Sequence, residues 1–77
     1  MSKATQIAKI LAYCAEHGSI TVREASVNLE INSPTKRISE MRLSGEFDVQ
    51  DVVETRTKDD GEIVRYKRYF IQKVGAA

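Results

Sequence analysis

Four polar side chains between residues 33 and 44 have the types and spacing needed to contact nucleic-acid bases. They are Thr35, Lys36, Ser39 and Glu40. A lysine can donate to O6 and N7 of guanine, a threonine can touch a thymine methyl group, and a glutamate can accept from N4 of cytosine. Their spacing places them on one side of a helix, opposite Ile38 and Met41. The alternative interpretation is a solvated helix face, which any small helical protein has.

The same stretch supplies groups suited to a phosphate backbone. Ser33 and the free amides of a helix that begins at Pro34 can bind a phosphate, although Ser33 also suits an ordinary N-cap. Pro34 fits the first helical position because its missing N–H would have no partner there. Arg37 and Arg42 can bind phosphates, or each can pair with an acidic side chain of another element. We interpret Arg42 as a phosphate contact and leave both roles open for Arg37.

A second group of basic residues lies in the last third of the chain. Arg56 and Lys58 come just before an expected turn, and Arg65, Lys67 and Arg68 follow it. On a hairpin, cations in these positions can straddle a minor groove. The acidic residues interleaved with them are Asp48, Asp51, Glu54, Asp59, Asp60 and Glu62. This mixture leaves open the alternative of an ordinary solvated hairpin face.

The remaining reactive side chains form no catalytic or metal-ligating set. His17 is the only histidine, and its expected position at the end of a helix suits its charge. Cys14 is the only cysteine, which excludes an internal disulfide, and its apolar neighbours predict a core position. The sequence also has no phosphate-binding loop and no nucleophile motif. We therefore expect no enzymatic activity, no metal and no cofactor.

Length and charge narrow the class of protein. The 77 residues predict a single domain over residues 1–77. The net charge is only +1, but residues 33–45 hold three basic and one acidic side chain, whereas residues 46–77 hold six basic and seven acidic ones. The locally positive stretch is thus the one that carries the base-contacting set. Since there is no membrane-length apolar run and no secretion signal, we expect a cytoplasmic protein without a membrane partner.

The apolar periodicity predicts a first helix over residues 2–16. Ser2 suits its N-cap and Gly18 suits its stop. The apolar stripe consists of Ile7, Ile10, Leu11 and Cys14. A short extended piece, Ser19–Ile20, follows this helix.

Two further helices are predicted over residues 21–30 and 34–44. The second helix starts with a capping box, in which Thr21 is followed three residues later by Glu24. The third helix ends at Gly45. The link of about four residues between them is typical of a helix-turn-helix pair.

The rest of the chain predicts a β-hairpin with strands over residues 47–57 and 62–72. A turn at Lys58–Gly61 joins them. The apolar alternation breaks at Val52–Val53 and at Tyr69–Ile71, which predicts a bulge or a change of face and leaves the register open. The fold class is therefore α+β, with three helices followed by a C-terminal hairpin.

With these elements in place, the chain resembles the small winged helix-turn-helix proteins common in bacteriophages and prophages. The segments that carry the resemblance are Gly18–Ala25, Ser33–Arg42, Gly45 and Val64–Tyr69, and the likeness extends over residues 5–72. It implies binding of double-stranded DNA through the third helix and the hairpin, which is the wing of that family. The acidic residues of the hairpin depart from the family pattern.

Three hypotheses of function follow from these observations, of which the third is a detached domain of a replication or recombination machine. The first is a sequence-specific DNA-binding protein, such as a phage or prophage transcriptional regulator or an excision-type factor, which would act as a homodimer or in repeated copies because one small helix contacts few base pairs. The second is a protein-binding module on the same fold, namely an adaptor, an anti-repressor or a DNA mimic. The acidic wing and the low net charge favour the second.

Overall fold

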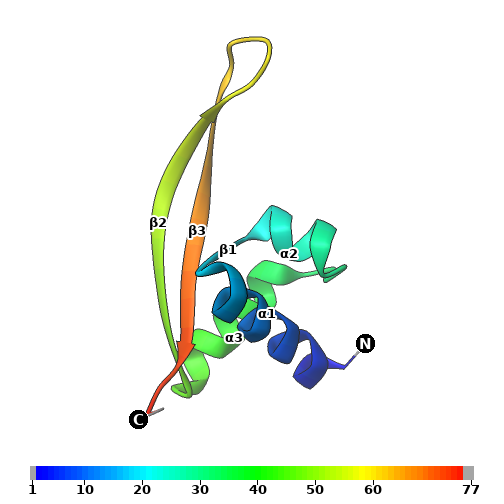
Figure 1. Cartoon of the computed structure of the whole chain (residues 1–77), viewed down its shortest axis with the longest axis vertical. Coiled ribbons are helices and arrows are strands. Elements are labelled where there is room, and N and C mark those ends of the chain that lie inside the picture. The colour runs from blue at the N-terminus through cyan, green and yellow to red at the C-terminus, as the bar shows by residue number, and fades with distance from the viewer. Residues whose placement is uncertain (1, 76–77) are drawn as a thin grey trace.

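The computed structural model describes residues 2–75, within which three helices pack against one end of a long β-hairpin (Figure 1). The helices are α1 (Lys3–His17), α2 (Val22–Asn28) and α3 (Pro34–Ser44). The strands are β1 (Ile20–Thr21), β2 (Phe47–Thr57) and β3 (Ile63–Lys73). They form an antiparallel sheet in the order β1-β3-β2. The expected α+β arrangement is confirmed, and strand β1 shares Ile20 with the extended piece that was predicted at Ser19–Ile20.

The helix ends follow the local signals in the sequence. Ser2 caps α1, because its hydroxyl oxygen accepts from the amide of Thr5 at 3.1 Å. Gly18 ends the helix in the left-handed conformation, at φ 87°, that favours glycine. At the start of α2, the amide of Thr21 donates to the carboxylate of Glu24 at 2.9 Å, and the amide of Glu24 donates to the hydroxyl of Thr21 at 3.1 Å. The predicted capping box is therefore confirmed.

The second helix is shorter than the sequence predicted. It ends at Asn28 rather than at residue 30, because Glu30 has a left-handed φ of 57° that no helix can continue through. The amide of Ile31 then donates to the carbonyl oxygen of Ala25 at 3.2 Å, which turns the chain back over the helix. Ile31 is 1% exposed as a result. A residue predicted to lie in a simple connection is thus part of the core.

The hairpin runs without a bulge, so that prediction was wrong. Every residue of β2 has a partner in β3, from Phe47 opposite Lys73 to Thr57 opposite Ile63. The apolar alternation breaks because part of the hairpin extends past the helices, as Figure 1 shows, and no residue from Val52 to Lys67 is fully buried. Val52 and Val53 point to opposite faces, and both are exposed. The loop of residues 58–62 is closed by the amide of Lys58, which donates to the carbonyl of Glu62 at 2.7 Å.

The hydrophobic core lies between α1, α3 and the half of the sheet nearest the helices. Its members are Ile10, Cys14, Ile20, Ala25, Ile31, Ile38, Met41, Tyr69 and Ile71. Each large apolar side chain buried in this way stabilises the fold by about 1.5–3 kcal/mol. The core therefore holds α3 by one face and leaves its other face in solvent.

Candidate nucleic-acid interface

One face of α3 is fixed in the core and the opposite face is free. Ile38 and Met41 are buried, as predicted. Thr35, Lys36 and Ser39 are exposed, and none of their side chains makes a hydrogen bond to another part of residues 2–75. Their donors and acceptors are available to an outside partner. The structure thus brings three of the predicted base-contacting residues together on one surface.

Leu43 extends this surface and was not predicted as a site residue. Its side chain is 86% exposed, although leucine is ordinarily a core residue. It lies four residues after Ser39 and eight after Thr35, so the three side chains form a row along the helix. This spacing is a signal that the sequence contained. We call Thr35, Lys36, Ser39 and Leu43 the α3 stripe.

Arg37 is a structural residue, which corrects its inclusion among the DNA contacts. It is 7% exposed, and its Nη1 donates to Oε2 of Glu40 at 3.2 Å. Its Nε is buried and has no partner within the described residues. A guanidinium in this position cannot reach a phosphate without leaving the interior. Glu40 is held by the same pair, and its carboxylate is therefore less available to a cytosine than the sequence suggested.

The start of α3 also differs from the prediction. Ser33 makes no side-chain capping bond; only its carbonyl oxygen is used, accepting from the amide of Arg37 at 3.1 Å. Pro34 occupies the first turn as expected, but it is buried, so it begins the helix and presents no surface for a contact. The Ser33 hydroxyl is exposed, and its predicted phosphate contact stays a prediction.

The basic residues of the hairpin are divided between its two faces. Directly opposed residues of an antiparallel pair share a face. Arg65 and Lys67 pair with Thr55 and Val53, on the face that continues from the core, whereas Arg56 pairs with Val64 on the other face. We call the part of the hairpin from Val52 to Arg68 the wing.

Two predicted DNA contacts meet at one acidic side chain. Nη2 of Arg42 lies 3.8 Å and Nζ of Lys67 lies 3.5 Å from Oδ2 of Asp51. The Arg42 and Lys67 side chains are 49% and 56% exposed, so each pair contributes at most about 1 kcal/mol. Phosphate groups can therefore compete for both cations. The cluster also places α3 and the wing side by side.

Arg68 joins the wing to the helices, a role that the sequence did not indicate. Its Nε donates to Glu54 at 2.9 Å, its Nη1 donates to the hydroxyl of Ser19 at 3.1 Å, and the same Nη1 lies 3.5 Å from Glu24. The hydrogen bond from Arg68 lowers the pKa of Glu54, and the bond to Glu54 raises the pKa of Arg68. The side chain is thus occupied by β2, α2 and the chain before β1, which fixes the wing relative to the helices.

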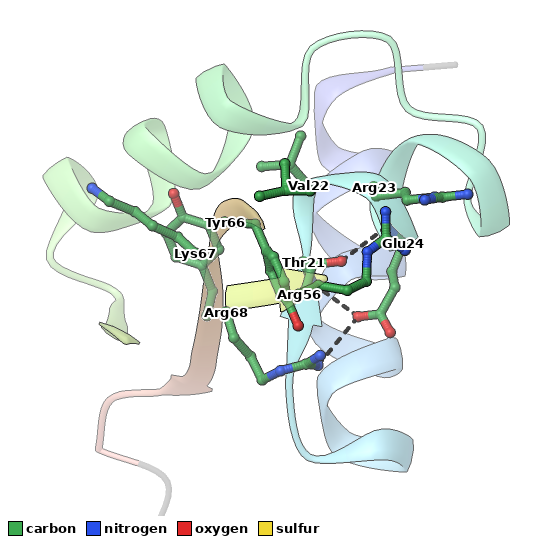
Figure 2. Close-up of a pocket in the computed structure, with 10 residues that line it drawn as sticks. Thr21, Val22, Arg23, Glu24, Arg56, Tyr66, Lys67 and Arg68 are labelled. Carbon is green, nitrogen blue, oxygen red and sulfur yellow. Dashed lines mark hydrogen bonds and ion pairs between the residues drawn. The ribbon is translucent and has the colours of Figure 1, made fainter. Parts of the chain in front are cut away.

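A cavity of about 570 Å³ separates the wing from the start of α2 (Figure 2). It is lined by Thr21, Val22, Arg23, Glu24, Arg56, Val64, Tyr66, Lys67, Arg68 and Tyr69. Figure 2 shows Arg56 and Arg68 extending from the hairpin toward α2. Four of the lining residues are basic and only Glu24 is acidic. Within the described part of the chain, Arg23 and Arg56 form no ion pair, so this side of the wing carries positive charge despite the acidic hairpin.

Two further titratable residues, Cys14 and His17, lie on α1. Cys14 is 5% exposed, as its predicted core position requires, and burial raises the pKa of its thiol. His17 is the last residue of α1, and its ring centroid lies 4.3 Å from that of Tyr13. Among residues 2–75, no three metal-ligating side chains come together.

Comparison with known proteins agrees with this geometry. The model of the winged helix-turn-helix domain family matches residues 5–74. The chain belongs to this family. Comparisons with curated proteins and with solved structures found no match. Membership suggests DNA binding, but it does not establish a phage or prophage origin. None of the helices in the described part of the chain has the length and apolar character needed to cross a membrane.

Proposed function

We propose that this winged helix-turn-helix domain binds double-stranded DNA with sequence specificity, with α3 in the major groove and the wing beside it. The observation that carries the proposal is the α3 stripe, whose polar groups make no hydrogen bonds within residues 2–75 and whose helix meets the wing where Arg42 and Lys67 both approach Asp51. In helix-turn-helix proteins, the exposed face of the second helix of the motif contacts base edges. Lys36 suits a guanine, and Leu43 suits a thymine methyl group.

The charges outside the α3 stripe would hold the phosphate backbone. Arg65 and Lys67 on one face of the wing, and Arg56 on the other, provide cations on both sides of a groove. Arg42 and Lys67 would exchange Asp51 for phosphates on binding. Each phosphate contact releases counterions from DNA, so the affinity should fall steeply as salt is added.

The small size of the domain favours a regulatory or architectural role. A single module buries an interface at the low end of what specific recognition needs, so two or more copies would act together on one site. We infer a transcriptional regulator or an excision-type factor of the kind that phages and prophages use. Both roles need only binding at a defined site, which the α3 stripe and the wing can supply.

The test is selection of bound fragments from a random DNA pool, followed by titration of variants on the selected site and on random DNA. Lys36→Ala should weaken binding to the selected site by about 1–3 kcal/mol and change binding to random DNA much less. Lys3→Ala, an exposed lysine on α1, is the matched control. Equal losses on both DNAs would reduce Lys36 to a phosphate contact, and no binding to any DNA at low salt would refute the proposal.

A protein-binding module is the second candidate, because the wing exposes apolar side chains. Val53 is 64% exposed and Ile63 is 66% exposed, on a wing whose cations are partly neutralised. A Val53→Ser/Ile63→Ser variant separates the two functions. If the wing docks on a protein, this variant loses a partner that survives nuclease treatment and keeps its affinity for DNA. If the domain acts on DNA alone, nuclease treatment removes the captured partners from the wild type and from the variant alike.

A further inference from the structure

Within residues 2–75, no strand pairs with the outer edge of β2. The sheet order β1-β3-β2 makes β2 an edge strand, and in Figure 1 it forms the side of the hairpin away from α1 and α2. The strand is 11 residues long and contains neither proline nor lysine, and its pairing with β3 shows no bulge. Proteins normally use those features to keep an edge from pairing with another chain. The protective feature that this edge does have is charge, from Asp48, Asp51, Glu54 and Arg56, and two of these, Asp51 and Glu54, are already paired within the chain.

The hydrogen bonds at the two ends of the hairpin show which backbone groups face outward. The amide of Lys58 donates to Glu62, and the amide of Val74 donates to Glu46. Hydrogen-bonded pairs alternate along an antiparallel ladder, so the even-numbered residues of β2 direct their N–H and C=O groups to β3. The odd-numbered residues, Val49, Asp51, Val53 and Thr55 among them, direct theirs to the free edge.

We propose that this edge pairs antiparallel with β2 of a second copy of the chain, with Val52 opposite the second copy's Val52. In this register the outward groups meet, because Asp51 lies opposite Val53 and Val49 lies opposite Thr55. The even-numbered residues then form the non-hydrogen-bonded pairs, whose side chains approach most closely. Val52, which is 48% exposed in the single chain, is covered at the centre.

Charge complementarity selects this register. Asp48 lies opposite Arg56 of the second copy, and the two-fold symmetry forms this pair twice. Within residues 2–75, neither Asp48 nor Arg56 has an ion-pair partner, whereas Asp51 and Glu54 are already paired. Arg56 is exposed and can turn from the cavity of Figure 2 toward the strand edge.

Other registers are less favourable. A shift of two residues in one direction places Arg56 opposite Gln50, so Asp48 no longer faces Arg56 and meets only Lys58, beyond the end of β2. A shift of two in the other direction places Asp51 opposite Asp51 and Asp48 opposite Glu54, so that like charges meet. A shift of one residue opposes outward groups with groups already bonded to β3.

The pairing has a geometric consequence. A two-fold axis that relates antiparallel edge strands stands perpendicular to the sheet, so the helices of both copies lie on the same side and the two wings point in opposite directions. The interface does not depend on DNA, and a single copy would keep its α3 stripe. Dimer formation and DNA binding can therefore fail independently.

Sedimentation velocity of the full chain without DNA, over a series of concentrations up to about 1 mM, tests the proposal. The wild-type chain should associate to a dimer. Asp48→Arg and Arg56→Asp each replace two ion pairs with two repulsive contacts, and each should raise the dissociation constant about tenfold. The Asp48→Arg/Arg56→Asp double variant should restore it. Glu16→Arg and Lys3→Asp make the same changes of charge on exposed positions of α1 and should have no effect.

A proline at position 53 tests the backbone part separately. Val53→Pro removes an N–H that faces the free edge and is not used by β3, so the hairpin should survive while the dimer dissociates. A wild-type chain that stays monomeric at about 1 mM overturns the proposal. A dimer that persists in Val53→Pro also overturns it, as does a dissociation constant that Asp48→Arg and Arg56→Asp leave unchanged. If Val53→Pro does not fold, the charge exchange and its restoration decide the question.

Discussion

The two halves of the hairpin share apolar residue types and lie in different environments. Both contain β-branched and aromatic residues, and both are paired residue for residue. Near the helices, Tyr69 and Ile71 are 7% and 6% exposed. In the wing, Val53 and Ile63 lie on the same face of the sheet and are 64% and 66% exposed. Whether an apolar residue of the hairpin is buried therefore depends on whether it lies next to the helices or beyond them, and not on its residue type.

The comparison shows what holds the wing in place. A two-stranded hairpin on its own is at best marginally stable in water. The wing has little apolar burial, so it depends on the ladder continued from the packed half and on Arg68, which ties it to α2. A wing held in this way can keep its surface for a partner.

The largest expected effect comes from deleting the same atoms in each half. Ile71→Ala should lower the free energy of unfolding by about 2–5 kcal/mol, because it leaves a cavity in the core. Ile63→Ala, on the same strand and the same face, should change it by less than about 0.5 kcal/mol. Urea titrations followed by circular dichroism measure both. Similar losses of unfolding free energy for the two variants would show that the wing is packed as firmly as the half of the hairpin near the helices.

The next effect concerns DNA binding and contrasts the wing with the α3 stripe. Arg65→Ala/Lys67→Ala should weaken binding equally on the selected site and on random DNA, and should reduce the slope of log affinity against log salt by up to about two. Lys67 gives less than a full contact because it is shared with Asp51. Fluorescence anisotropy at several salt concentrations measures the slope. A loss confined to the selected site would mean that the wing also contacts bases.

A smaller effect is expected where Arg68 joins the wing to the helices. Arg68→Met keeps most of the side-chain volume and removes the contacts with Glu54, Ser19 and Glu24, so the free energy of unfolding should fall by about 1 kcal/mol. Arg65→Met, three residues earlier on β3 and exposed, should have almost no effect. Equal results for the two methionine variants would remove Arg68 as the link between the wing and the helices.

Local signals in the sequence predicted the elements well. The capping box of Thr21 and Glu24, the stop at Gly18 and the inward Ile38 and Met41 each depend on residues within one turn of each other. The end of α2 was misplaced because the left-handed conformation of Glu30 has no sequence signature. The bulge was wrongly predicted because the length of the hairpin beyond the helices is a property of the whole fold.

The site was predicted in part, for a related reason. The polar face of α3 follows from helical spacing, which also contains the overlooked Leu43. The burial of Arg37 and the network of Arg68 depend on residues far apart in the chain, such as Ser19 and Arg68, whose contact spans 49 positions. No pattern in one sequence shows which arginine is free to bind a phosphate and which is held by the protein.

The smallest expected effect is a dependence of stability on pH that comes from Glu54, the partner of Arg68 on β2. The hydrogen bond from Arg68 lowers the pKa of Glu54 below its ordinary value of 4.5 in the folded chain. The unfolded chain then binds a proton at this group more readily than the folded chain does. The ion pair therefore contributes fully above about pH 4.5, and its contribution is lost as the pH falls through the folded pKa.

Glu54→Gln should be less stable than the wild type at pH 7, and this difference should shrink toward pH 3. Urea titrations at a series of pH values measure it, with Glu62→Gln in the exposed loop as the control. A constant difference between wild type and Glu54→Gln across that range would show that Arg68 holds the wing without a charged partner on β2.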